Sequence, residues 1–503
     1  MRALLVTSVG VTCAAALTLP LAAPASSAPV LSAASARPPS LTTEPGTDTT
    51  DTSGTSRTTA PDTITSPDGA ELRAAKSAAA PAGSTQSLPL APLAVPSNRV
   101  AGAPAVQGLP QRDARPFSLV GVVWDDAEAE LHGTVQVRTR ATGTTRWSDW
   151  QDVETHNADH AADLGSAERE GRTVRGATAP LWVGDSDGVE VRVRPESPAA
   201  PESQDRAATP VPLPEGMRLE LVDPGEDPAP EPARGAPANR AAVPAVFADT
   251  PPTAALPEVL TAEIAAASAV NAEVAEIGAS VIPALTQAET AESVNLAPGA
   301  KPYIGPRPRI VTRKGWGADE KLRERNFGYT KSVKAAFVHH SATGNNYTCK
   351  QAPSVLRSIY RYHVKSSGWR DFGYNFAVDK CGNIYEGRAG GVTKAVLGAH
   401  TLGFNTNTMG IAVLGSYGST NPPAAAVTAV SKLTAWKLGL FGANPKGKVT
   451  LVSGGSNKYK KGVKVKMNVI SGHRDGFATE CPGARLYKKL GTARTSSAKL
   501  QGR

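Results

Sequence analysis

Aromatic residues and cysteines are scarce in this chain of 503 residues. Aromatics make up 5% of it and there are 4 cysteines, against 41 prolines and 47 glycines. Such a composition excludes a chain that is packed core throughout, and the length exceeds what one hydrophobic core usually organises. Long apolar runs are lacking outside the extreme N-terminus, which excludes a protein with several membrane spans. The sequence therefore predicts at least two folded units joined by linkers.

The one long apolar run lies at the N-terminus and predicts a signal peptide. A short positive start, Met1-Arg2, precedes residues 3–23, which are mostly Leu, Val and Ala. Residues 23–25 read Ala-Pro-Ala and offer small side chains at both positions that a signal peptidase reads. An uncleaved anchor is the alternative, which we favour less because the run is weakly apolar. We expect residues 1–25 to be removed and the mature chain to be secreted, without a stable membrane anchor.

Acidic residues are rare in the last two hundred positions. Residues 301–503 hold 34 basic and 8 acidic side chains, a net charge of +26, whereas residues 1–300 carry a net charge of −17. A domain so basic is expected to be attracted to a negatively charged partner. Nucleic acid is not the expected partner, because no signature of a nucleic-acid recognition module accompanies the charge.

Composition divides the rest of the N-terminal part into three stretches. Residues 26–115 are rich in Ala, Ser, Thr and Pro without an apolar period, which predicts a disordered segment. In residues 116–223 apolar and charged side chains alternate in short runs between turn signals, which predicts a small all-β domain of unknown role. Residues 224–305 return to Ala and Pro and predict a linker, although residues 257–292 can also form an Ala- and Glu-rich helix.

Four of the seven tryptophans fall within the predicted β-domain: Trp124, Trp147, Trp150 and Trp182. Such a cluster can stack on sugar rings. Packing in the core is the more ordinary role of buried tryptophan, and we favour it here.

The C-terminal part alternates predicted strands with predicted helices, and five of the eight histidines lie in it. Periodicity places strands at 335–340, 374–379, 384–386, 396–400 and 409–414, helices near 353–366 and 424–440, and a basic hairpin at 449–469. This order predicts an α/β domain over residues 306–492, with a mixed β-sheet flanked by helices. Residues 493–503 are predicted to be a basic tail.

Three cysteines remain once Cys13, within the predicted signal peptide, is set aside. An odd number in an exported protein predicts one disulfide and one cysteine with another role. Cys349 and Cys381 are the natural pair and close a loop of about 30 residues, which stabilises the fold by roughly 3 kcal/mol. Cys481 then requires a different explanation.

Three short stretches carry the candidate chemistry: FVHHSAT at 337–343, GHRD at 472–475 and TECPG at 479–483. They supply His339, His473 and Cys481, two imidazoles and one thiolate. Three such ligands leave the fourth tetrahedral position of a zinc ion to water, and this open position distinguishes catalytic from structural zinc. Zinc lowers the pKa of its bound water and so makes a hydroxide available at neutral pH. The alternative is two buried histidines and an unrelated thiol.

Residues 308–490 resemble the zinc-dependent N-acetylmuramoyl-L-alanine amidases of the peptidoglycan recognition protein family, the type 2 amidases. The matching stretches occur in the family's order: GWGA (315–318), FVHHSAT, DFGYNFAVDKCGNIYEGR (371–388), GAHTLGFNTNTMGIAVLG (398–415) and GHRDGFATECPGARLY (472–487). They span about 180 residues. The resemblance implies the fold of this family for the C-terminal domain. The layout, with an Ala- and Pro-rich front, looks like that of secreted actinobacterial amidases.

The resemblance also implies roles for single residues. By it the zinc ligands are His339, His473 and Cys481. Tyr374 matches a tyrosine near the metal-bound water, and Thr479 matches a position that some members fill with Lys. Both are expected to assist catalysis by hydrogen bonding to the oxyanion. The cysteine is typically replaced in members that only bind peptidoglycan, so its presence here favours catalysis.

Substrate contacts follow less directly. His400 and Asn405 match positions that line the family's substrate groove, and Trp369 is expected to border the groove for the stem peptide. A His400 whose hydrogen bonds are satisfied in the core is the alternative. His340 is predicted to be structural, because its side chain points to the other face of the strand from His339.

The predicted function is that of a secreted, cell-wall-associated zinc hydrolase. It would cleave the amide bond between N-acetylmuramic acid and L-alanine in peptidoglycan. A non-catalytic peptidoglycan-binding module is the alternative, and a third hypothesis gives wall binding chiefly to the β-domain. The basic C-terminal domain is expected to be attracted to anionic wall polymers, although a lysine-rich hairpin is often only a solvated face.

Overall fold

The computed structural model describes residues 83–93, 106–155, 160–166, 169–196, 211–228, 260–294 and 303–503. The predicted signal peptide and most of the segment predicted to be disordered lie outside the described residues. Among the helices that the structure describes, none is long and apolar enough to cross a membrane.

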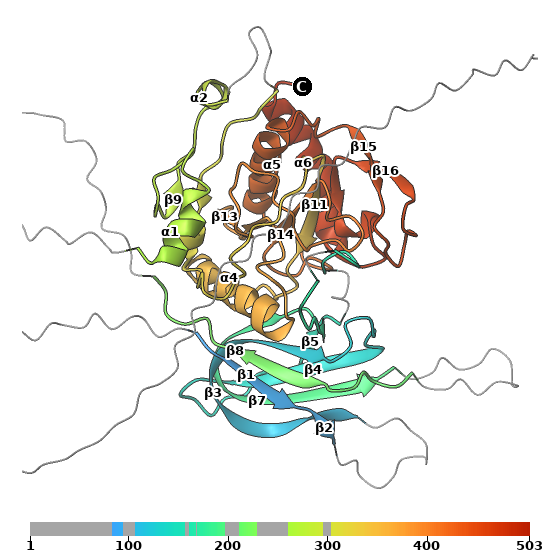
Figure 1. Ribbon diagram of the computed structural model, residues 1–503. Helices are drawn as coiled ribbons and strands as arrows, with labels where there is room; N and C mark the ends of the chain where they lie inside the picture. Colours follow the sequence, from blue (N-terminus) through green and yellow to red (C-terminus); the bar gives the residue numbers. More distant parts are fainter. Residues whose placement is uncertain are drawn as a thin grey trace, which may run out of the picture. The chain divides into compact units, whose positions relative to one another are not determined.

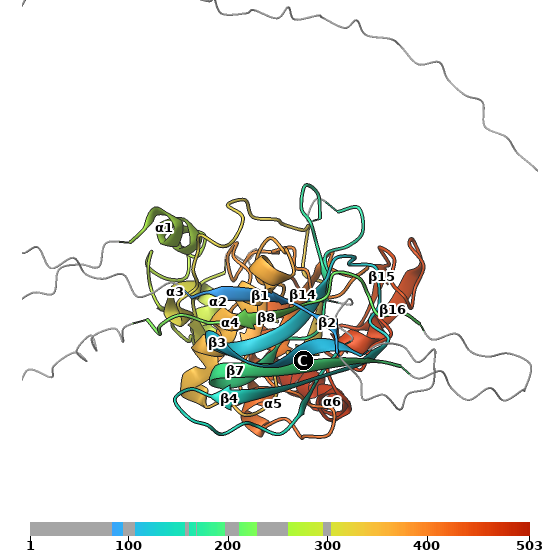
Figure 2. The same cartoon turned by 90° about the horizontal axis from the view of Figure 1, so that it is seen from below.

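The N-terminal domain is an antiparallel β-structure, drawn in blue to green in Figure 1. Its strands are β1 (Thr85–Pro89), β2 (Ala91–Pro92), β3 (Gln107–Trp124), β4 (Gly133–Ala141), β5 (Gln151–Val153), β6 (Gly176–Ala177), β7 (Leu181–Pro195) and β8 (Arg218–Val222). Five of them lie side by side in the order β1-β8-β3-β7-β4 (Figure 2), and β5 follows at the edge. Successive side chains of a strand point to opposite faces of the sheet. Val189, Val191 and Val193 of β7 are therefore all buried in the core, and the charged residues between them point away from it.

The β-domain begins earlier than residue 116. Strand β1 and the first half of β3 lie within residues 26–115, so the prediction of disorder is wrong for 85–92 and 107–115. The first half of β3 pairs with β7 through two register shifts, and most of its side chains are exposed. A polar, irregular strand of this kind shows no apolar period in the sequence.

The C-terminal domain is built on a mixed sheet of seven strands, which confirms the predicted fold class. The strands are β9 (Val281–Ile282), β10 (Ile310–Val311), β11 (Ala335–His340), β12 (Phe376–Val378), β13 (Ile384–Glu386), β14 (Thr408–Val413) and β17 (Ile470–Gly472). Their order is β17-β11-β14-β12-β13-β10-β9. The neighbours β17, β11, β14 and β12 are parallel, while β12 and β13 are antiparallel.

Helices cover both faces of this sheet. Helices α5 (Ala424–Gly439) and α6 (Ala484–Leu500) pack on one face, against Val338, Met409 and Ile411. Helix α4 (Ala352–Arg361), which continues into a π-helical turn over Tyr362–Ser366, packs on the other face against Ala377 and Ala412. The remaining elements are α1 (Ala262–Ala269), α2 (Gln287–Glu292), α3 (Arg313–Trp316), the short 3-10 turns Cys349–Gln351 and His473–Asp475, and the hairpin β15 (Lys448–Val452) and β16 (Lys464–Asn468).

Three boundaries differ from the predicted ones. Residues 260–294 are no linker, because they form α1, β9 and α2, and β9 pairs with β10 in the sheet. Residues 493–500 continue α6 and bury Ala493 and Ala498, so they are no tail. The strand predicted at 396–400 is absent; that stretch makes only an isolated bridge between Val396 and Tyr329. In the first two cases few large apolar side chains mark the packed backbone, whereas the third is an apolar run whose backbone bonds to loops.

The described residues form one unit, in which the β-domain shares a hydrophobic cluster with the C-terminal domain. Trp182 and Leu119 of the β-domain pack in the same cluster as α4 and Tyr362. The Tyr362 hydroxyl donates a hydrogen bond to the backbone oxygen of Thr178 at 3.1 Å. A Cβ on Gly121 would lie 2.4 Å from that hydroxyl, so the close approach requires glycine. The contact between the domains is therefore packed and specific.

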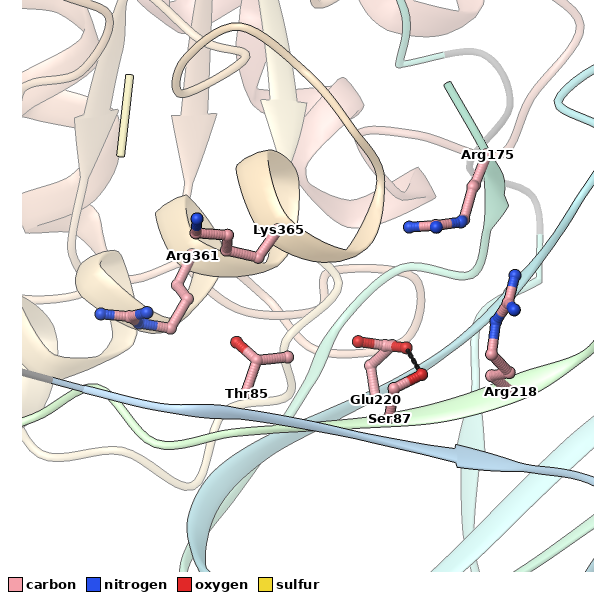
Figure 3. A pocket seen from close by; sticks show the side chains of 7 residues that line it. All are labelled: Thr85, Ser87, Arg175, Arg218, Glu220, Arg361 and Lys365. Carbon is pink, nitrogen blue, oxygen red and sulfur yellow. Dashed lines mark hydrogen bonds between the residues drawn. The ribbon is translucent and has the colours of Figure 1, made fainter. Parts of the chain in front are cut away.

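A polar cavity of about 370 Å³ also lies between the domains. Figure 3 shows the side chains that line it, Thr85, Ser87, Arg175, Arg218 and Glu220 from the β-domain and Arg361 and Lys365 from α4 and the turn after it. The Glu220 carboxylate accepts hydrogen bonds from Ser87 of its own domain and from Ser366 of the other. The interface thus combines an apolar part with a polar, charged part.

Candidate metal centre

The sheet brings two histidines to one edge. His339 lies near the carboxyl end of β11, and His473 follows the carboxyl end of β17 directly. Because β11 and β17 are parallel neighbours, their carboxyl ends meet at the same edge. Cys481 lies after the turn that starts at His473, and the backbone N–H of Arg474 donates to its oxygen at 3.0 Å, which closes the loop. Residues far apart in the sequence thus converge.

A fourth donor joins these three. His160, between β5 and β6 of the β-domain, places its ring against the same group. Its Nε2 lies 3.2 Å from Nδ1 of His473 and 3.6 Å from Sγ of Cys481, while Sγ lies 3.8 Å from Nδ1 of His339. All four donor atoms lie within 4.8 Å of one another, and the group is capable of holding a metal ion.

The spacing of these atoms fits zinc. A tetrahedron with Zn–N bonds of about 2.05 Å and a Zn–S bond of about 2.3 Å has N···N edges of about 3.3 Å and N···S edges of about 3.6 Å. The corresponding separations here are 3.2 Å for the nitrogens of His473 and His160, and 3.6 and 3.8 Å for the two pairs that include the sulfur of Cys481. Two or more imidazoles with one thiolate are also the donor types that zinc prefers.

Burial favours the neutral, metal-binding form of His339. His339, His473 and Cys481 have no exposed surface, and His160 is 4% exposed. Burial lowers the pKa of His339 well below its usual value, and the neighbouring imidazoles of His473 and His160 lower it further. The neutral imidazole that results is the form that coordinates metals.

Tyr374 and Thr479 lie beside the cluster. The ring of Tyr374 is centred 5.3 Å from that of His339 and 5.8 Å from that of His160, and its side chain is 4% exposed. The hydroxyl of Thr479 accepts a hydrogen bond from the backbone N–H of Cys481 at 3.2 Å. This bond holds the turn that presents the cysteine.

The residues predicted to line the substrate groove are buried. His400 has no exposed surface, and its two ring nitrogens lie 3.0 and 3.4 Å from the hydroxyls of Thr401 and Thr408, as the core alternative has it. Asn405 accepts hydrogen bonds from two backbone N–H groups with its oxygen and donates with its nitrogen to the β-domain. Trp369 stacks on His363 and borders a cavity of about 430 Å³ that His160 also lines.

The structure joins Cys349 and Cys381 by a disulfide, with their Cα atoms 6.2 Å apart. His340 lies away from the donor atoms: its Nδ1 accepts from the backbone N–H of Tyr417, and its Nε2 lies 3.3 Å from a carboxylate oxygen of Glu154. A structural role agrees with both contacts.

His160 is the residue that sequence reasoning missed. It lies in a domain with no recognisable metal motif and is 179 residues from His339. The one available signal was chemical, because a three-ligand zinc site leaves a position that a fourth imidazole can fill.

Comparison with known proteins identifies both domains. Residues 329–484 match the family model described as N-acetylmuramoyl-L-alanine amidase, and residues 70–212 match the one described as Rv3811 N-terminal galactose-binding domain-like. Peptidoglycan-recognition protein SC2 of Drosophila simulans is 30% identical over 185 residues, which are 36% of this chain and 85% of that protein. The human N-acetylmuramoyl-L-alanine amidase is 30% identical over 194 residues, which are 37% of this chain and 28% of that protein.

Solved structures of similar proteins cover the same part of the chain. Drosophila PGRP-LB is 25% identical, with 36% of this chain and 92% of that chain covered and a TM-score of 0.29. Peptidoglycan recognition protein LE, in complex with tracheal cytotoxin, is 28% identical with the same coverage and TM-score.

Proposed function

The chain belongs to the family of peptidoglycan recognition proteins and type 2 N-acetylmuramoyl-L-alanine amidases, and we propose that it is a zinc-dependent amidase. It would hydrolyse the amide bond between the lactyl group of N-acetylmuramic acid and L-alanine in peptidoglycan. The observation that carries the proposal is the convergence of His339, His473 and Cys481, whose donor atoms lie within 4.8 Å of one another beside Tyr374.

The proposed ligands are the two histidines of the sheet edge and Cys481. Zinc bound there supplies a polarised amide carbonyl and an activated water. Tyr374 is buried next to His339, and its hydroxyl is proposed to donate a hydrogen bond to the oxyanion that develops on the carbonyl. Thr479 is proposed to act mainly by positioning, since its hydroxyl already accepts from the N–H of Cys481.

Peptidoglycan is the proposed substrate because relatives that this chain resembles are named for recognising it. The predicted signal peptide supports secretion to the wall. The net charge of +26 over residues 301–503 supports an added attraction to anionic wall polymers, which salt should weaken.

A non-catalytic peptidoglycan-binding module is the second candidate, and one observation favours it. His160 stands where a catalytic site needs an open position, so the group resembles the closed ligand set of a structural zinc site.

The test is hydrolysis of purified peptidoglycan by the full chain, both unchanged and with His160→Gln. New amino termini of L-alanine are quantified with and without a chelator, and after zinc is restored. We expect amino termini of L-alanine to be released and chelation to abolish their release. Adding Cys481→Ala to the His160→Gln chain should abolish it as well. A folded, zinc-loaded His160→Gln chain that binds peptidoglycan and releases nothing would establish the binding module instead.

A further inference from the structure

His160 belongs to the β-domain, yet it lies at the metal centre of the C-terminal domain. Contacts made by residues before and after His160 in the chain hold its segment, residues 160–163, in place. Before His160 in the chain, the carboxylate of Glu154 lies 3.3 Å from Nε2 of His340. After it, the carboxylate of Asp163 accepts hydrogen bonds from the N–H of Gly403 at 2.7 Å and from the side-chain nitrogen of Asn405 at 2.8 Å. His160 is therefore positioned by contacts to the same domain that supplies the other donors.

The same segment covers the surface next to the metal centre. The side-chain nitrogen of Asn405 also donates to the backbone oxygen of Ala161 at 2.9 Å. Nearby, Arg172 of the β-domain donates to the backbone oxygen of Trp369 at 3.2 Å. Asn405 and Trp369 are two of the residues predicted to contact substrate, and the β-domain engages the side-chain nitrogen of the first and the backbone oxygen of the second.

Docking of the whole domain keeps the segment near its site. Trp182 and Leu119 share a buried cluster with α4, and the backbone N–H of Trp182 donates to the oxygen of Thr343 at 3.1 Å. Figure 1 shows α4 lying against the β-domain. A donor held in this way has a high effective concentration at the metal centre.

We propose that Nε2 of His160 is the fourth protein ligand of the metal and that residues 160–163 keep the enzyme latent. The bound imidazole completes a closed set of three nitrogens and one sulfur and excludes solvent from the reactive position. Activation then exchanges this nitrogen for solvent without any change of oxidation state, and frees Asn405 for substrate. The ligand assignment stands alone, whereas latency rests on the proposed amidase function.

The ligand assignment is tested on the full chain loaded with Co²⁺. The absorption bands of Co²⁺ report the number and type of its ligands, and azide serves as a probe of an open position. We expect azide to leave the spectrum of the unchanged chain as it is and to alter that of His160→Gln. Affinity for Zn²⁺ should fall about tenfold or more in the variant, since even second-shell changes cost about 10- to 100-fold.

His132→Gln is the matched control, because His132 is an exposed histidine of the same domain. It should behave as the unchanged chain does. Glutamine preserves much of the volume of His160, and thermal unfolding checks that both variants are folded. If azide alters the unchanged chain and His160→Gln alike, and the Zn²⁺ affinities agree, His160 is not a ligand and the proposal is wrong.

Latency is tested by turnover of soluble muropeptides. His160→Gln should be faster than the unchanged chain by tenfold or more at saturating zinc, with His132→Gln unchanged. Equal or slower turnover of a zinc-loaded His160→Gln chain would overturn latency. Absence of turnover in every variant, together with the expected Co²⁺ spectra, would overturn the amidase function and leave His160 as the fourth ligand of a closed metal site.

Discussion

Removing the anchor of the His160 segment should activate the enzyme without touching a metal ligand. In Asp163→Ala the carboxylate that accepts from Gly403 and Asn405 is lost. Hydrogen bonds to charged groups contribute about 1.5–3 kcal/mol each. Burial raises the pKa of Asp163, which shows that desolvation offsets part of this gain. We therefore estimate that loss of the two hydrogen bonds of Asp163 costs about 1.4 kcal/mol of docking free energy. This corresponds to about tenfold weaker docking of the segment in the variant.

The assay is turnover of a soluble muropeptide at saturating zinc by the full chain. If the docked state dominates, a tenfold shift in docking should raise turnover by about tenfold, with the zinc content unchanged. Asp149→Ala is the control, since Asp149 is an exposed aspartate of the same domain. Turnover of Asp163→Ala that stays within twofold of this control would refute the reasoning, because the segment would then not be held by Asp163.

Three further predictions concern the fold and the metal. Burial raises the pKa of Glu386 to about 7 from an ordinary 4.5, so the folded state holds a proton that the unfolded state releases. The free energy of unfolding should therefore fall by roughly 3 kcal/mol between about pH 4.5 and 7, a slope that urea titrations of Glu386→Gln should lack. Arg313→Met should cost about 3–5 kcal/mol in the same assay, because it removes the buried guanidinium that pairs with the carboxylates of Glu320 and Asp371, and Glu320 keeps only Arg323 as an ion-pair partner. Chelation should lower the Tm of the unchanged chain more than that of Cys481→Ala, whose site binds zinc less tightly.

Two strands of the C-terminal sheet, one of which carries His339, could be predicted closely from the sequence. Strand β11 spans 335–340 as predicted, because six buried residues in a row are typical of a parallel central strand. Strand β13 also has its predicted bounds, 384–386. Strand β17, which precedes His473, is not among the predicted strands. Its pairing with β11, and with it the meeting of His339 and His473, comes from the structure.

Segments that fold through backbone contacts alone could not be predicted. The N–H groups of Leu397 and Ala399 donate to the oxygens of Gly328 and Gly373, two separate loops, so an apolar run that looks like a strand forms none. The short strand β9 has Ile282 as its only fully buried residue. Neither feature leaves a periodic trace in the sequence.

The position of His160 could not be predicted for a different reason. Its role depends on how two domains pack, and that packing depends on contacts such as Gly121 against the ring of Tyr362. Gly121, which has no side chain, and the phenol of Tyr362, more than 200 residues later, form no recognisable pattern in the sequence. Only the folded chain shows that His160 lies at the metal centre.

Release of the segment does not require the domains to separate. The segment is held by a few polar contacts, those of Asp163 and Glu154 among them, whereas the domain is held by the buried cluster around Trp182. Local opening of polar contacts costs less free energy than exposure of a packed apolar cluster. The side-chain nitrogen of Asn405 donates to the segment, so a substrate that used Asn405, as the proposal has it, would compete with the segment for this group. By linkage, a ligand that fills the groove must shift the segment outward. Peptidoglycan that binds there would thus open the coordination position needed for its own hydrolysis, and the β-domain can remain docked while it does so.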